Sequence, residues 1–164
     1  MKLGSHFLRS AAKHLGERYI LGALAPKNNA RWSGPWDCAE FVSWVVYQVT
    51  GQLHGCASNI TPPVPMPTRA TGRVMRRRPC SASPWPLALR TPGAILNRIP
   101  AHGLIGHIAF SDGKGGTIEA HSTKRGVIAG SATGRRWDMG LLLPGVRYTR
   151  ERRSGTRSAC NTAD

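Results

Sequence analysis

Apolar residues recur at helical spacing in a stretch close to the N-terminus. They lie on one face between Ser5 and Leu15, where the pattern predicts a helix. Ser5 is placed to cap its start, and Gly16 is placed to end it. The 22–36 stretch that follows is rich in Pro, Gly, Ser and Asn, so a loop is expected there.

The clearest periodic pattern in the chain begins at Cys38. From this residue to Val49 the apolar positions form one uninterrupted helical stripe. Asp37 is suited to cap the helix, Glu40 stands at capping-box spacing, and Gly51 is a typical stop. The sequence therefore predicts a buried helix whose first residue is a cysteine.

Short runs of alternating apolar residues predict strands in the C-terminal half. After a turn at 92–93, strands are expected over 94–98 and 104–111. The glycine-rich run 112–116 reads as a hairpin loop that leads into a third strand over 117–121. Helices followed by a small antiparallel sheet predict an α+β fold.

The segment 61–90 has neither a helical nor a strand period, and most of it is expected to lack secondary structure. It contains 7 prolines and 6 arginines, and no acidic residue occurs from position 41 to position 111. A long structureless insert inside a compact domain needs an explanation. Two explanations stay open: a disordered surface loop, or codons read out of frame between two compensating shifts.

Composition makes charge the most unusual property of the chain. The 164 residues include 23 Lys and Arg against 8 Asp and Glu, which gives a formal net charge of +15. This balance favours anionic partners such as nucleic acid, lipid headgroups or an acidic cell-wall polymer. The basic residues are scattered without interleaved aromatics, so a nucleic-acid module is not favoured.

Length and apolar content fit one domain over 1–148, followed by a basic disordered tail over 149–164. No apolar run is long enough to span a membrane, and charges interrupt every candidate secretory signal near the N-terminus. We therefore expect synthesis in the cytoplasm. Access to a cell wall would then need a phage-type or other non-classical delivery route.

The four cysteines, at positions 38, 56, 80 and 160, show no metal-binding spacing. Cys38 alone is placed in the first turn of a capped helix. Unpaired backbone N–H groups and the positive end of the helix dipole favour a thiolate there, and the same N–H groups suit an oxyanion hole. The alternative is a small buried core residue, which is the usual role of a cysteine.

Two histidines are placed to meet across the predicted hairpin. With the turn centred on Lys114, Ser111 faces Thr117 and His107 faces His121. One imidazole can then act as a base while the other fixes its tautomer and orientation. The alternative is that both are ordinary half-exposed strand residues.

A zinc site made of Cys38, His107 and His121 is a further alternative, but the sequence offers no fourth ligand. We therefore expect neither a metal nor an organic cofactor.

Several segments follow one another in order along the chain, namely DCAEFVSWVVYQVTG, a Pro-Gly turn, and GHIAFSDGKGGTIEAHS followed by GV. In these segments the chain resembles the NlpC-type family. Members of this family are papain-like bacterial cell-wall cysteine peptidases, and the resemblance covers residues 5–53 and 91–146. It implies a papain-like α+β fold, with the nucleophile helix packed on a small antiparallel sheet. It also implies hydrolysis of amide bonds in peptidoglycan by a thiol peptidase or amidase, which we expect to be a monomer.

The same resemblance implies a role for individual residues. Cys38 is the nucleophile, His107 the general base and acid, and His121 the residue that orients His107. Tyr19 is the nearest counterpart of a tyrosine that family members often carry near the oxyanion hole, and Asp37 belongs to the cysteine motif chiefly as a helix cap. Glu119 lies on the same strand face as His121 and is the alternative third member, as in CHAP-type amidases.

Two rival functions remain. One is a catalytically inactive, basic wall-binding module of the same fold, and the other is a nucleic-acid-binding protein supported only by the net charge. Thiol reactivity at Cys38 separates the first rival from an enzyme, and the salt dependence of DNA binding tests the second.

Overall fold

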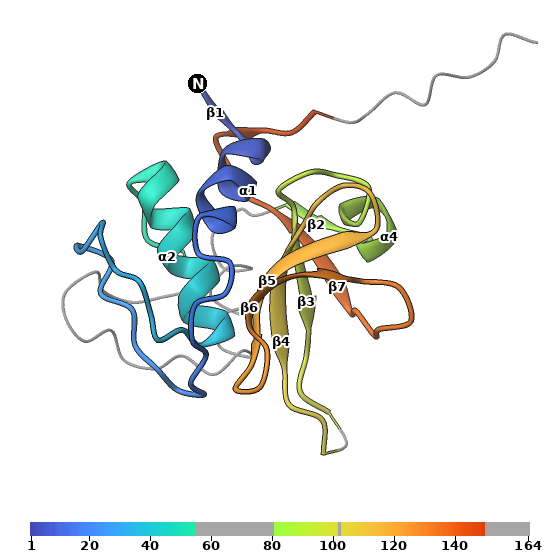
Figure 1. Cartoon of the computed structure of the whole chain (residues 1–164). Coiled ribbons are helices and arrows are strands. Elements are labelled where there is room, and N and C mark those ends of the chain that lie inside the picture. The colour runs from blue at the N-terminus through green and yellow to red at the C-terminus, as the bar shows by residue number, and fades with distance from the viewer. Residues whose placement is uncertain (55–80, 102, 150–164) are drawn as a thin grey trace, which may run out of the picture.

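The computed structural model describes residues 1–54, 81–101 and 103–149. The chain forms a six-stranded sheet with the strand order β2-β7-β3-β4-β5-β6, in which every neighbouring pair is antiparallel. Its strands are β2 (Ser81–Ser83), β3 (Ile95–Arg98), β4 (His107–Ser111), β5 (Gly116–Ser122), β6 (Gly126–Ser131) and β7 (Met139–Leu142). Figure 1 shows helices α1 (Gly4–Ala12) and α2 (Cys38–Thr50) side by side next to this sheet. The expected α+β fold is confirmed.

Three further elements complete the described chain. Two short strands, β1 (Lys2–Leu3) and β8 (Val146–Arg147), pair in parallel and join the two ends of the described chain. The short helix α4 (Trp85–Ala88) contacts β7 and β3.

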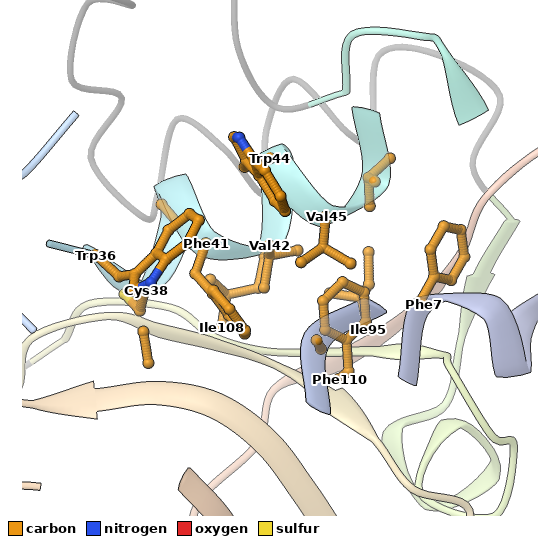
Figure 2. Packing of buried hydrophobic residues seen from close by; sticks show 14 of the residues in the cluster. Phe7, Trp36, Cys38, Phe41, Val42, Trp44, Val45, Ile95, Ile108 and Phe110 are labelled. Atoms are coloured by element: carbon orange, nitrogen blue, oxygen red, sulfur yellow. The ribbon is translucent and has the colours of Figure 1, made fainter. Parts of the chain in front are cut away.

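The apolar stripe of α2 forms the centre of the main core. Figure 2 shows Phe41, Val42 and Val45 pointing from the helix toward the strand residues Ile108 and Ile95. All five side chains are completely buried. Because side chains alternate along a strand, Leu96 and Ala109 belong instead to a smaller core with Ala88 and Trp137. The sheet is thus covered on both faces, which fixes its register.

Helix α2 begins and ends where the sequence predicted. Asp37 is its N-cap, and its Oδ1 accepts a hydrogen bond of 2.9 Å from the Ala39 N–H. Gly51 ends the helix in a left-handed conformation with φ of 69°, which glycine adopts without strain. The prediction of a capping box between Asp37 and Glu40 is wrong. The Glu40 side chain does not bond back to the helix start but forms an ion pair with Lys27.

Helix α1 differs from the prediction at both ends. It starts at Gly4 with Leu3 as its N-cap, so Ser5 lies inside the helix and does not cap it. It ends at Ala12, before Gly16, whose N–H donates to the Val127 carbonyl 2.8 Å away. This bond ties the turn after the helix to β6, which no helical period could indicate.

The irregular segment is shorter than expected. Residues 81–83 form β2 and pair with β7, and residues 85–88 form α4, so the end of the 61–90 segment belongs to the fold. Its first part, 61–80, lies outside the described residues, as do Cys56, Cys80 and the proposed tail from 150 onward. No described helix is long and apolar enough to cross a membrane.

Candidate active site

Cys38 is the first residue of α2, as predicted. The thiol is not in a disulfide and is only 3% exposed. It lies beside Trp36 at the start of the helix, as Figure 2 shows. Its place in the first turn puts it next to backbone N–H groups that have no carbonyl partner inside the helix. These groups can stabilise negative charge on the sulfur or on a neighbouring oxygen.

The segment before the helix brings Tyr19 toward Cys38. Tyr19 and Trp36 form a parallel β-bridge, in which Trp36 N–H donates to Arg18 C=O and Ile20 N–H donates to Trp36 C=O, each over 2.9 Å. Burial, followed by the negative charges of Cys38 and Asp37, raises the pKa of Tyr19 well above its usual value. Tyr19 therefore keeps its phenolic proton and can act as a hydrogen-bond donor beside the thiol.

Asp37 connects the start of α2 to the segment that carries Tyr19. While its Oδ1 caps α2, its Oδ2 accepts a hydrogen bond of 2.9 Å from the Gly22 N–H. One carboxylate thus fixes the helix start and the strand-like segment that carries Tyr19. Its role in the structure is positional, as the sequence indicated.

His107 lies at the start of β4 and is 6% exposed. Its Nε2 is hydrogen-bonded to the Glu119 carboxylate. Because an ionised carboxylate only accepts hydrogen bonds, Nε2 carries a proton, and in the neutral imidazole the lone pair is then on Nδ1. This is the tautomer that a general base needs if it is to take a proton at Nδ1.

Glu119 is completely buried and is bound on every side. Arg135 donates from Nη1 to Oε1 over 2.5 Å and from Nη2 to Oε2 over 2.8 Å, and the Thr117 hydroxyl donates to Oε1 over 2.5 Å. Burial opposes ionisation, but the hydrogen bonds from His107 and Arg135 outweigh it and hold the pKa of this carboxyl well below its usual range. Glu119 is therefore a fixed negative charge behind the imidazole.

Arg135 and Trp137 close this cluster on the face opposite α2. The Arg135 guanidinium lies 4.8 Å from the centre of the Trp137 ring, which in turn lies 6.1 Å from the His107 ring. Space for the carboxylate comes from Gly130 of β6, where an added Cβ would lie only 3.0 Å from Glu119 Oε1. The position of the imidazole is thus determined by the three strands β4, β5 and β6 and by the loop after β6.

His121 is a neighbour of His107 but does not orient it. The hairpin register is the expected one, with Ser111 opposite Thr117, and the two imidazole centres are 6.1 Å apart. However, His121 Nδ1 shares a hydrogen bond of 3.0 Å with the Ser122 hydroxyl, and the bond to His107 comes from Glu119. The expectation that His121 orients His107 is therefore wrong, and the alternative residue, Glu119, makes the hydrogen bond to His107.

The position of His121 also changes its protonation. Burial lowers the pKa of His121, and the charges of Arg135 and Arg125 lower it further, against the opposing effect of Glu119. His121 is therefore a neutral polar group near neutral pH, facing the same cavity as His107.

A cavity of about 280 Å³ lies beside the two imidazoles. It is lined by Tyr19, His107, His121 and Arg98, with Leu21 and Ile105 at its rim. The two rim side chains are largely exposed, at 60% and 64%. The cavity therefore combines polar and cationic groups with an apolar edge.

Sequence reasoning missed Arg135, Thr117 and Arg98. The alternation of Thr117, Glu119 and His121 on one strand face was the only signal for the polar cluster. Arg135 comes from a loop 16 residues beyond Glu119, where no periodic pattern predicts a contact. As for the zinc alternative, the described residues contain no group of three His, Cys, Asp or Glu side chains suited to a metal ion.

Comparison with known proteins gives matches in structure alone. No protein-family model matches this sequence, and no curated protein matches it either. Among solved structures, the chain is similar to the NlpC/p60 domain of the peptidoglycan hydrolase SagA, with a TM-score of 0.59 and 21% identity. That alignment covers 85% of this chain and 98% of the SagA domain.

Two further solved structures give the same result. The P60 domain of antigen MAP1204 from M. avium subspecies paratuberculosis matches with a TM-score of 0.59 and 15% identity, over 85% of this chain and 93% of that one. NlpC1 from Trichomonas vaginalis matches with a TM-score of 0.55 and 17% identity, over 90% of this chain, which spans 45% of the Trichomonas protein. The chain therefore has the NlpC/p60-type, papain-like fold that its cysteine and histidine motifs resemble.

Proposed function

We propose that this protein is a thiol-dependent amide hydrolase that cleaves the stem peptides of peptidoglycan. The observation that carries the proposal is the His107 imidazole, whose Nε2 is held by the buried Glu119 carboxylate while its ring lines a cavity together with Tyr19. Tyr19 lines this cavity with His107, and the charge of Cys38 contributes to the raised pKa of Tyr19, which supports placing the thiol near the base. One of the structural neighbours, SagA, is named a peptidoglycan hydrolase.

In the first half of the proposed reaction, the Cys38 proton passes to His107 Nδ1, and the resulting thiolate attacks the amide carbonyl. The carbonyl oxygen gains the negative charge, which the backbone N–H groups at the start of α2 stabilise. When the tetrahedral intermediate collapses, His107 gives the proton to the leaving amine and a thioester to Cys38 remains.

In the second half, water attacks the thioester with His107 again as the base, and the carboxylic acid product leaves Cys38. Glu119 acts in both halves by holding the Nε2–H and stabilising the imidazolium that forms. It keeps its negative charge throughout, because Arg135 and Thr117 bind its oxygens. His121 has no proton-transfer role in this scheme.

The net charge of +15 suits a polyanionic wall substrate, since it raises the local concentration of anionic polymers. This contribution depends on ionic strength and is separate from the chemistry of the site. Activity on an isolated, uncharged stem peptide should therefore depend less on salt than activity on intact peptidoglycan.

The proposal is tested by digesting purified peptidoglycan with wild-type protein, Cys38→Ser and His107→Asn, and reading the released fragments by mass spectrometry. Wild-type protein should release peptides cut at one type of amide bond, and both variants should release none. Cys56→Ser is the matched control, because Cys56 lies outside the motif, and it should be active. Equal digestion by Cys38→Ser, or no digestion by wild-type protein, would reject the proposal.

A further inference from the structure

Arg98 stands directly beside the imidazole that we propose as the base. It is the last residue of β3 and the register partner of His107 on β4. Paired residues of antiparallel strands project to the same face with their Cβ atoms about 5 Å apart. Both side chains line the same cavity, so the Arg98 guanidinium borders the proposed reaction site.

The Arg98 side chain has no carboxylate partner in the described part of the chain. Its Nε is buried and has no hydrogen-bond acceptor. Every carboxylate of the described residues is bound elsewhere, to partners other than Arg98. These carboxylates belong to Glu17, Asp37, Glu40, Asp112, Glu119 and Asp138.

A buried donor without an acceptor is costly, and the Nε of the half-buried Arg98 side chain is such a donor. The other arginine near the site, Arg135, is by contrast fully engaged in its two hydrogen bonds to Glu119. No carboxylate of the described chain lines the cavity, whose charged and polar groups are Arg98, two imidazoles and hydroxyls. Among the described residues the cavity thus has a cation and no anion, and a substrate can supply one.

We propose that Arg98 binds a carboxylate of the substrate beside the scissile amide, which makes the enzyme selective for stem peptides with a free carboxylate at that point. This inference rests on the proposed function and deepens it. A guanidinium binds a carboxylate through two parallel hydrogen bonds, a geometry that a neutral carboxamide cannot reproduce. The exposed Leu21 and Ile105 at the rim suit the small apolar side chain of a neighbouring residue.

The test uses two synthetic stem peptides that differ only in whether the group next to the cleaved bond is a carboxylate or a carboxamide. Wild-type protein should favour the carboxylate peptide in kcat/KM by roughly 10- to 100-fold, the range expected of a hydrogen bond to a charged group. In Arg98→Gln this ratio should fall to near one, mainly through KM for the carboxylate peptide. Arg98→Lys should keep an intermediate ratio, because it retains the charge without the two-pronged geometry.

Arg90→Gln is the matched control, since it removes one positive charge from an exposed position outside the cavity. It should leave the preference as in wild-type protein. A wild-type ratio near one, or an unchanged ratio in Arg98→Gln, overturns the role of Arg98. An equal fall in Arg90→Gln and Arg98→Gln also overturns it, because the effect would then come from net charge alone.

Binding to Cys38→Ala separates this inference from the proposed function. Calorimetry on this variant should show the carboxylate peptide binding roughly 10- to 100-fold more tightly than the carboxamide, with the difference lost in Cys38→Ala/Arg98→Gln. If wild-type protein hydrolyses neither peptide while this difference persists, the proposed reaction fails and the carboxylate site stands. If hydrolysis occurs and the difference is absent, only the role of Arg98 fails.

Discussion

The substitution Glu119→Gln tests whether the buried charge cluster holds the site together. Glutamine has the same shape as glutamate and can still accept one hydrogen bond, but it removes the negative charge that faces Arg135 and His107. The Glu119 side chain is completely buried and the Arg135 side chain is 22% exposed, so the guanidinium would lose its counter-charge in a largely dry site.

The expected loss follows from this burial. Removing one partner of a buried ion pair costs roughly 3–5 kcal/mol of unfolding free energy, because the remaining charge is left uncompensated. Arg135 retains some contact with water, so the lower end, about 3 kcal/mol, is expected at neutral pH. Asp138→Asn is the matched control. Its pair with Arg136 is more open, with side chains 23% and 43% exposed, and its loss should cost less than about 1 kcal/mol.

The same substitution predicts a pH dependence. The pKa of Glu119 is lower in the folded state than in the unfolded chain, where it is about 4.3, so the ionised carboxylate stabilises the fold above that pH. This contribution is lost as the pH falls below about 4.3 toward the folded pKa. The stability gap between wild-type protein and Glu119→Gln should therefore persist between pH 7 and pH 5 and shrink in stronger acid.

Urea unfolding followed by tryptophan fluorescence measures this gap, and equal m-values in the two proteins would show that the unfolded states are comparable. A gap at pH 7 no larger than that of Asp138→Asn would refute the buried cluster. A gap that does not shrink as the pH falls below about 4.3 would refute the assigned ionisation of Glu119.

Three further results are expected. In steady-state hydrolysis assays, Glu119→Ala should lower kcat/KM by about 100-fold or more and His121→Ala by less than about tenfold, because Glu119, and not His121, is hydrogen-bonded to His107. The reverse order would restore His121 as the residue that orients His107. Gly130→Ala places a Cβ 3.0 Å from Glu119 Oε1 and should lower the free energy of unfolding in urea by about 1–3 kcal/mol. An unchanged urea midpoint would mean that the carboxylate moves freely. Lys27→Met leaves the buried Glu40 unpaired and should cost about 3 kcal/mol in the same assay, and a stabilised protein would contradict the ion pair.

The sequence was most informative where several local signals agreed. For α2, the apolar period, the Asp37 cap and the Gly51 stop all marked the same ends, and the structure confirms them. The hairpin register followed from an odd loop length, which places Ser111 opposite Thr117. Local sequence was sufficient in both cases because the determining contacts lie within a few residues of one another.

The third partner of His107 needed information that the sequence pattern lacks. Glu119 and His121 share one strand face, so alternation alone could not choose between them. The choice is made by Arg135 and Thr117, which bind the Glu119 oxygens, and by an irregularity in the β5–β6 pairing between Ala120 and Ser122. The pairing of β2 with β7 was missed for a similar reason, since it joins residues about 60 positions apart.

The reactivity of Cys38 tests the catalytic assignment most directly, because it needs no substrate. Wild-type protein and His107→Ala would be treated with iodoacetamide across a pH series, and alkylation of each cysteine would be followed by peptide mass mapping. In wild-type protein Cys38 should react rapidly already at about pH 6, well below the pH of about 8.5 at which an ordinary thiol ionises. This early reaction should disappear in His107→Ala. Alkylation of Cys38 only in the range of an ordinary thiol, with the same profile in both proteins, would contradict its assignment as the nucleophile.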